Sequence, residues 1–343
     1  VRGEPLKFSE EGVQLVTRNI ILPLWNSYSF FSTYANADDI SFKDLEKASP
    51  VQDRTMMDRW IISSMQSLVK TVNEKMENYY LYEVIPPLMN FVDELTNWYV
   101  RSNRKRFWKE KDENDIDKIN AFKTLHEVLL EFSKCMAPVL PFICEKIYQG
   151  LIEEENQSIH YCNYPTAKES LIDSELEENI ELAKKVIKSV RNLRVKLKLP
   201  NKQPLNSVKI ITKDREIENK LIVISDLIKN ELNVKEVLFD FDVDNWIDYE
   251  FKPNFKILGP KLGKQINKIS EYLKNVDEIT CDNILQGNAV VIDGIKISSN
   301  EIDVILNKKE EHENQDIVDD FSLVLDTSLD ETLIMERFSR ELV

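Results

Sequence analysis

Glycine is scarce in this chain, with only 7 glycines among 343 residues. No two glycines are separated by a single residue, and none begins a G-x-x-x-x-G-K-[ST] sequence. Backbone loops that wrap a dinucleotide or a triphosphate need closely spaced glycines, because only glycine lets the main chain approach phosphate that tightly. The sequence therefore excludes both of these phosphate-binding loops.

Cysteine and histidine are equally few. The four cysteines form no C-x-x-C pair, and the three histidines are scattered along the chain. We therefore expect no zinc site, no disulfide framework and no resident metal or cofactor, in a chain from a reducing compartment such as the cytoplasm. No nucleophile-elbow sequence is present, so no catalytic triad can be proposed. From its residues alone the chain is typical of a binding module.

Long apolar runs are also lacking. No stretch reaches about 18 uninterrupted apolar residues, so we expect no membrane-spanning helix. The chain starts with Val1 rather than Met, without an apolar leader, and its last residues, 331–343, follow a helical pattern. We therefore expect a segment of a longer protein, itself long enough for about two domains.

The formal net charge of -15 argues against a nucleic-acid partner, because phosphates repel an acidic surface. The basic residues are nevertheless concentrated. Residues 101–109 hold five basic side chains and no acidic one, and residues 184–202 hold eight and again no acidic one. Two basic segments on an acidic chain are more informative than the total charge.

Hydrophobic spacing predicts a mainly α fold, an antiparallel helical bundle followed by a smaller α+β domain. We expect the bundle in residues 1–165, a linker with a long basic helix in 166–204, and the α+β domain in 205–343. Ser9 suits the start of the first helix, and a third helix carries Pro86 and Pro87 in its first turn. Short β-branched runs predict strands after Pro204, two of them joined by a turn at Asp293-Gly294.

The basic segment that ends the third helix is the strongest candidate site. Helical spacing places Asn97, Arg101, Arg104 and Lys105 on one face, with Trp108 one turn later. Guanidinium groups suit phosphates and base edges, and aromatic rings suit unstacked RNA bases. Alternatively, these cations only complement the dipole of their own helix, with Phe107 and Trp98 in the core.

The second basic segment, 184–202, has two interpretations as well. It is either a stripe facing RNA or the solvated side of a helix whose other side carries Val186, Val190 and Leu193. Two other polar residues favour structural roles. Asn26, in Leu22-Pro23-Leu24-Trp25-Asn26-Ser27-Tyr28, lies between aromatics that suit a core, and His126 lies on an apolar helical face.

Several segments, in one order along most of the chain, resemble the isoleucyl-tRNA synthetase family of class I aminoacyl-tRNA synthetases. The segments are 1–8 (VRGEPLKF), 22–28 (LPLWNSY), 58–61 (DRWI), 91–101 (FVDELTNWYVR), 106–108 (RFW), 137–142 (APVLPF), 158–165 (SIHYCNYP) and 252–259 (KPNFKILG). The leucyl, valyl and methionyl relatives share a weaker version of the helical part.

The resemblance implies the anticodon-binding bundle and the C-terminal extension of such an enzyme. It implies an isoleucine tRNA as partner, bound through its anticodon stem-loop by the residues that follow: Asn97, Arg101, Arg104, Lys105, Arg106, Trp108, Arg194, Lys196 and Lys198. The catalytic and editing domains would precede Val1 in the same chain, with ATP and Mg used there. This segment would then bind RNA, catalyse nothing and be monomeric, with no membrane partner.

Two alternatives remain open at this point. The parent enzyme could be of the valyl or leucyl type, or the segment could be a helical protein-interaction scaffold that does not bind RNA. An isoleucine-specific parent is favoured by residues 252–259 and by the α+β tail. The tail also has no paired cysteines, unlike a bacterial subgroup that ends in a zinc module.

Overall fold

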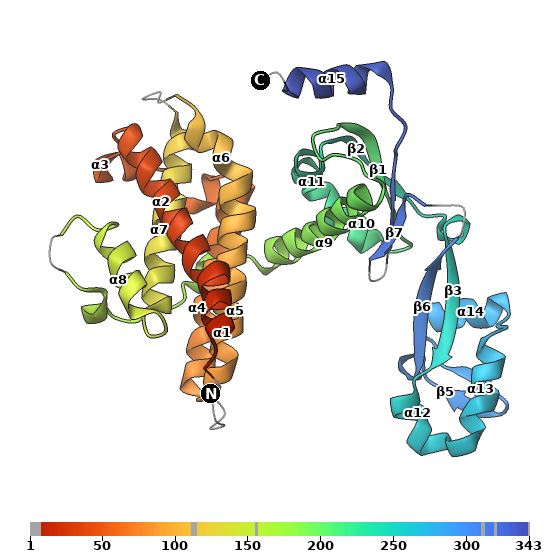
Figure 1. Ribbon diagram of the computed structural model, residues 1–343. Helices are drawn as coiled ribbons and strands as arrows, with labels where there is room; N and C mark the ends of the chain where they lie inside the picture. The colour runs from red at the N-terminus through yellow and green to blue at the C-terminus, as the bar shows by residue number, and fades with distance from the viewer. Residues whose placement is uncertain (1–7, 111–114, 155–156, 310–312, 319–320, 342–343) are drawn as a thin grey trace. The chain divides into compact units, whose positions relative to one another are not determined.

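The computed structural model describes residues 8–110, 115–154, 157–309, 313–318 and 321–341. The chain divides into two compact units, 1–178 and 179–343, which we describe separately. The first unit is a bundle of helices, and the second combines helices with small sheets (Figure 1). The expected mainly α fold with a smaller α+β region is confirmed. Residues 166–178 of the expected linker lie in the first unit and 179–204 lie in the second.

The first unit is built from α-helices and two π-helical turns. In chain order these are α1 (Glu10–Val16), the π-turn Thr17–Ile21, α2 (Leu22–Ala37), α3 (Phe42–Leu45), α4 (Met56–Glu77), α5 (Leu81–Asp93), the π-turn Glu94–Val100, α6 (Arg101–Trp108), α7 (Ile116–Met136) and α8 (Pro141–Gln149). Short 3₁₀ turns cover Val51–Asp53, Ile159–Tyr161 and Glu169–Leu171.

Side-chain caps set several helix starts, and the one at Ser9 is where the sequence predicts it. The Ser9 hydroxyl accepts a hydrogen bond from the Gly12 amide at 3.1 Å, and Thr55 does the same for Asp58 at 3.3 Å. These caps satisfy amide groups that have no partner inside the helix. Pro141 is the first residue of α8, where its missing N–H costs nothing.

The expected position of Pro86 and Pro87 is wrong. Helix α5 begins at Leu81, so both prolines lie inside it rather than in its first turn. The proline rings remove two main-chain donors there. Packing of the apolar face, with Val84, Leu88 and Phe91 buried, holds the helix together across this gap.

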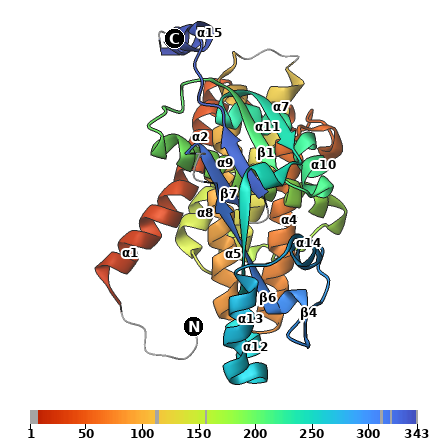
Figure 2. The same ribbon diagram turned by 90° about the vertical axis from the view of Figure 1, so that its right-hand side faces the viewer.

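A close-packed apolar core joins the long helices. Helix α4 packs against both α5 and α7 and buries Trp60 and Ile61. The Phe91 and Phe132 rings stack with their centroids 5.2 Å apart. Helix α1 contributes no buried residue and projects from the rest of the bundle in Figure 2. The core therefore fixes α2 and α4–α7, which carry the candidate site.

The second unit begins within α9, whose first turn belongs to the first unit, and continues into a four-stranded sheet. Helix α9 (Ser174–Lys196) buries a stripe from Ile180 through Val186 and Val190 to Leu193. The sheet has the order β2-β1-β8-β7, from β1 (Leu205–Ile211), β2 (Val234–Asp240), β7 (Gln315–Val318) and β8 (Phe321–Leu325). Helices α10 (Arg215–Val223) and α11 (Ser225–Leu232) make the crossover between the parallel strands β1 and β2.

A second small core completes this unit. Strands β3 (Ile247–Pro253) and β6 (Ile302–Lys308) pair antiparallel, from Ile247 opposite Lys308 to Pro253 opposite Ile302. Helices α12 (Phe255–Leu262), α13 (Ile266–Leu273) and α14 (Glu278–Leu285) enclose an apolar cluster with the hairpin β4 (Val290–Ile292) and β5 (Ile295–Ile297). The predicted turn Asp293-Gly294 joins this hairpin with both φ angles positive. The chain continues to α15 (Glu331–Glu341).

Candidate nucleic-acid interface

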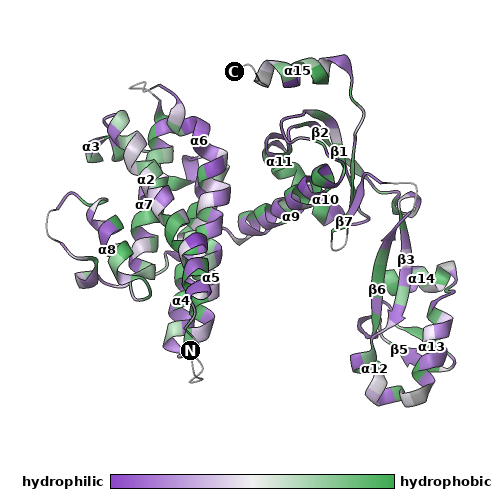
Figure 3. Cartoon of the chain, viewed as in Figure 1, coloured by the Kyte–Doolittle hydropathy of each residue, from purple (hydrophilic) through white to green (hydrophobic). Residues whose placement is uncertain are grey.

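The first basic segment lies on one uninterrupted helical run. Helix α5, the π-turn Glu94–Val100 and α6 follow one another without a break. The run turns Leu95, Tyr99, Asn103 and Phe107 inward, where all four are buried. It leaves Asn97, Arg104, Lys105 and Trp108 exposed. Helix α6 is accordingly mostly hydrophilic in Figure 3.

Arg104 and Lys105 are available to a ligand. Both side chains are exposed, and neither forms an ion pair within the part of the chain that the structure describes. Arg101 is half-buried, with its guanidinium carbon 5.8 Å from the centre of the Trp98 ring. These three cations follow the helical spacing predicted from the sequence.

Trp108 presents an indole ring at the end of the same helix. Its exposed fraction is 53%, unlike that of the preceding Phe107, which is 1%. A hollow of about 390 Å³ between the ends of α2 and α6 is lined by Trp108 together with Tyr34 and Asp38. The exposed indole therefore offers a flat apolar face beside the cations of α6.

Arg106 points in the opposite direction. Its two terminal nitrogens donate to the two carboxylate oxygens of Asp58, at 2.9 and 2.8 Å. One of these nitrogens also lies 2.8 Å from a carboxylate oxygen of Asp117. The Tyr99 hydroxyl donates to Asp58 at 2.6 Å as well. Side-chain exposure is 0% for Asp58 and 12% for Arg106, so this bidentate pair is a buried link between α4 and α6.

Burial and charge act together on the pKa values of this network. Burial raises the pKa of Tyr99 well above its ordinary value, and the Asp58 carboxylate raises it further. Burial alone would lower the pKa of Arg106, but the hydrogen bonds and attraction of Asp58, together with Tyr99 and Asp117, hold that pKa above its ordinary value. The Arg106 guanidinium is thus committed to the fold, and we leave it out of the proposed interface.

The second basic segment is similarly divided between the fold and the surface. Arg194 is 1% exposed, and its guanidinium donates to the main-chain carbonyls of Pro200, Gln203 and Leu232 at 2.8–3.0 Å. Arg191 pairs with Glu231 at 2.5 Å. Lys196 and Lys198 are exposed at the end of α9. Only these two of the three residues predicted here remain candidates for RNA contact.

A groove beside Arg104 adds Asn26, for which the sequence analysis favoured a structural role. It has a volume of about 300 Å³ and lies between α2 and the helical run of α6. Asn26 and Ser27 line it from α2, opposite Asn97 and Arg104. The only signal in the sequence was a polar residue, Asn26, within an otherwise apolar and aromatic segment. Its position next to Arg104 required the tertiary structure.

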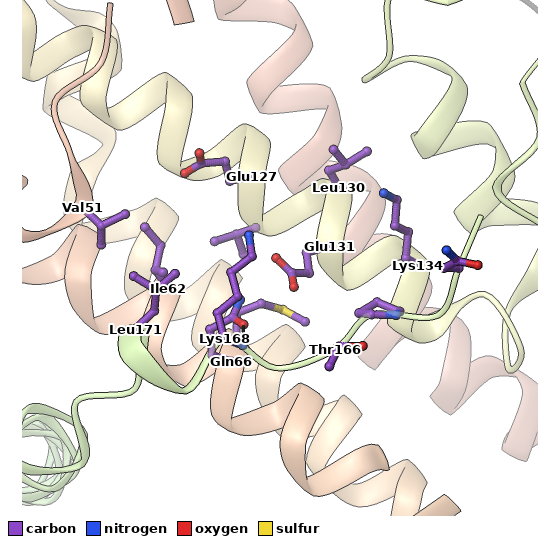
Figure 4. A pocket seen from close by; sticks show the side chains of 14 residues that line it. Val51, Ile62, Gln66, Glu127, Leu130, Glu131, Lys134, Thr166, Lys168 and Leu171 are labelled. Carbon is purple, nitrogen blue, oxygen red and sulfur yellow. Dashed lines mark hydrogen bonds between the residues drawn. The ribbon is translucent and has the colours of Figure 1, made fainter. Parts of the chain in front are cut away.

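A larger pocket of about 460 Å³ lies between α4, α7 and residues 163–171 (Figure 4). Its apolar floor includes Ile62, and its walls carry both signs of charge. Glu127 and Glu131 of α7 and the cations Lys134 and Lys168 all line it. Carboxylates on the wall would repel phosphate, so this pocket suits RNA less well than the α6 surface. Within the described residues, no group of three or more metal-ligating side chains is present.

Comparison with known proteins shows which family the segment carrying this surface resembles. Residues 58–210 match the family described as the anticodon-binding domain of tRNA ligase. This stretch of the chain is therefore similar to an anticodon-binding domain. The matched residues begin at Asp58, which holds Arg106, and include the whole of α6.

Whole-chain relatives agree with this assignment. The chain is 39% identical to an isoleucine–tRNA ligase of Treponema denticola over all of its length, covering 32% of that protein. It is 37% identical to one of Clostridium novyi, with 99% of the chain and 33% of the relative covered. For one of Clostridium tetani the identity is 38%, with 89% and 29% covered. The predicted resemblance to the isoleucyl family is confirmed, and the chain spans about a third of the length of these relatives.

Proposed function

We propose that this chain is the anticodon-binding and C-terminal part of an isoleucine–tRNA ligase, and that α6 binds the anticodon stem-loop. The observation that carries the proposal is the exposed group of Arg104, Lys105 and Trp108 within a segment that matches an anticodon-binding domain. Asn97 and Arg101 extend the same surface. The isoleucine type is supported by relatives of that type along the entire chain.

Binding would combine phosphate neutralisation with base stacking. Arg104 and Lys105 would each displace counterions from the RNA backbone, which makes affinity fall with salt. The Trp108 indole would stack on a splayed loop base, an interaction worth about 1–3 kcal/mol. Lys196 and Lys198 would add phosphate contacts along the anticodon arm.

The remaining steps of the reaction would belong to parts of the ligase outside this segment. ATP with Mg would be used there to activate isoleucine, in the cytoplasm, while this segment supplies affinity for the tRNA and no catalytic group. Within the described residues, no helix combines the length and apolarity that a bilayer crossing requires. We propose that the chain acts as a monomer.

The test is binding of the 343-residue chain to an isoleucine tRNA over a series of salt concentrations. We expect Arg104→Ala to weaken binding and to reduce the slope of log affinity against log salt by about 0.7, the value for one single-strand phosphate. Trp108→Ala should weaken binding by about 5- to 150-fold, the equivalent of 1–3 kcal/mol, with the slope unchanged. Lys146→Ala, which removes an exposed cation from α8, is the matched control and should bind like the parent.

Three outcomes would contradict the proposal. A chain that binds no tRNA in a salt-dependent way would favour the protein-interaction scaffold. Equal affinity and slope in the parent, Arg104→Ala and Trp108→Ala would show that RNA binds elsewhere. Tighter binding to a valine or leucine tRNA than to the isoleucine tRNA would contradict the isoleucine type.

A further inference from the structure

The groove beside Arg104 has the form of a small recognition pocket. Its volume is about 300 Å³, and two different helices face each other across it. Pro23, Phe30 and Val100 contribute apolar surface, while Asn26, Asn97 and Arg104 contribute polar groups. Both α2 and α6 directly follow π-helical turns, which often occur at functional sites because they redirect side chains.

The polar groups that line this groove retain hydrogen-bond donors and acceptors that the fold does not use. Asn97 donates its amide nitrogen to a carboxylate oxygen of Asp93 at 2.6 Å. Since a carboxylate only accepts, this bond fixes the amide orientation and leaves the Asn97 carbonyl oxygen as an acceptor. The exposed guanidinium of Arg104 has no hydrogen-bond partner among the described residues and offers a rigid fork of donors.

Asn26 supplies a third group of the same kind. Its side chain is exposed on α2, and its amide has no hydrogen-bond partner in the described part of the chain. An amide of this kind can donate and accept at once. The groove therefore combines a cationic donor fork, a fixed acceptor and an adaptable amide around a partly apolar space.

From this combination we propose that the groove binds one unstacked keto base, guanine or uracil, of the anticodon loop. The proposal deepens the tRNA-binding function and rests on it. Both keto bases carry a carbonyl oxygen next to an imino N–H. Arg104 would donate to the carbonyl oxygen from one edge of its guanidinium, while its charge still attracts the RNA backbone as proposed above. Asn97 would accept from the imino group, and Asn26 would bond a remaining edge.

The same groups disfavour the other two bases. Adenine and cytosine carry an amino group where the keto bases carry the carbonyl oxygen. That amino group would place a donor against the Arg104 donors, which costs affinity because buried donors are left unpaired. A phosphate is a poorer occupant as well, because the Asn97 oxygen and the nearby Asp93 carboxylate would face its negative charge.

The test uses the whole chain with anticodon stem-loops of an isoleucine tRNA, measured by fluorescence anisotropy at one salt concentration. Each loop guanine is replaced in turn by adenine and each loop uracil by cytosine. We expect one replacement to weaken binding by roughly 5- to 100-fold, as for loss of a bidentate base contact. Whether that position is a guanine or a uracil identifies the base.

Three variants then assign the effect to the groove. Arg104→Lys keeps the charge but removes the fork, and Asn97→Ala and Asn26→Ala remove the amides. We expect each to reduce the difference between the parent loop and the sensitive replaced loop, by up to the same roughly 5- to 100-fold. The salt dependence of Arg104→Lys should stay that of the parent. Thermal melts followed by circular dichroism should match the parent, since all three side chains are exposed.

Lys105→Ala is the matched control on the same helix, outside the groove. It should weaken binding to every loop by the same factor and leave base discrimination intact. If no replacement affects binding, or if discrimination survives in all three variants, the base pocket is wrong while salt-dependent tRNA binding still stands. Absence of any salt-dependent binding would overturn both the pocket and the proposed function.

Discussion

Arg106 provides the sharpest test of how the basic residues divide between RNA binding and folding. Its partner Asp58 has no solvent exposure, and Arg106 itself is 12% exposed. Removing one member of a buried ion pair leaves the other charge without compensation, at a cost of about 3–5 kcal/mol. We therefore expect Arg106→Ala to lower the free energy of unfolding of the helical unit by about 3–5 kcal/mol.

Urea unfolding followed by tryptophan fluorescence measures this loss. The chain has five tryptophans, and four of them lie within residues 1–178. In a Trp246→Phe background the emission therefore reports the helical unit alone, which avoids mixing two transitions in one curve. The slope of free energy against urea should be unchanged, as expected for a change in stability only.

Lys109→Ala is the matched control at the end of the same basic segment. Lys109 is exposed and lies 3.8 and 3.9 Å from the carboxylates of Asp115 and Asp117. Exposed pairs of this kind contribute about 0–1 kcal/mol, so the control should be nearly as stable as the parent.

The pair can also be removed as a unit. The double variant Asp58→Asn, Arg106→Met should lose less stability than the sum of the two single variants, because neither buried charge is then left alone. A loss below about 1 kcal/mol for Arg106→Ala would refute the reasoning, because that is the range of a solvated surface pair. So would a fully folded Arg106→Met protein that lost tRNA affinity as strongly as Arg104→Ala.

Three further expectations concern the stability of each unit. Burial lowers the pKa of His126, so the folded state favours the neutral imidazole. The stability that this contributes is complete above the pKa of about 6.5 that histidine has in the unfolded chain, and it is lost as the pH falls below that value. Urea unfolding at about pH 7.5 and pH 5.5 should show a larger loss for the parent than for His126→Gln, and equal losses would count against a buried neutral imidazole. Arg194→Ala should destabilise the second unit by about 3 kcal/mol or more, since each of three carbonyls left without its donor costs about 1–3 kcal/mol. The urea transition of the second unit is the part of the fluorescence signal that Trp246→Phe removes, and its midpoint would not shift if those bonds were dispensable. Gly150→Ala would place a Cβ only 1.9 Å from the Tyr28 hydroxyl oxygen and should cost about 1–3 kcal/mol. Adding Tyr28→Leu should recover most of that loss in a thermal melt, and the absence of recovery would place the clash elsewhere.

Local rules account for much of the fold. The Ser9 cap and the Asp293-Gly294 turn both depend on neighbouring residues, and each is found where the sequence predicts it. Helix α5 was misplaced because proline is a strong local signal, whereas the packing that carries α5 past Pro86 is not local. Strand β7 carries no such local signal, because half of Gln315–Val318 is polar and the strand is held by its pairing with β8.

The candidate site was likewise predictable from the sequence only in part. The sequence by itself determined that basic residues cluster at 101–109 and 184–202, and that an indole follows the first cluster, because helical spacing and composition are properties of neighbouring residues. It could not determine which cations face the solvent. Asp58 lies 48 positions from Arg106 along the chain, and Leu232 lies 38 positions from Arg194.

Only the tertiary structure brought those partners together and so decided the role of each cation. A guanidinium that meets a buried carboxylate, or several main-chain carbonyls, loses its hydration and stays in place only if those groups replace the water. Arg106 and Arg194 meet that condition, whereas Arg104 and Lys105 keep their solvent contact. Folding also placed Asn26 across a groove from Arg104, a pairing that no spacing in the sequence could show.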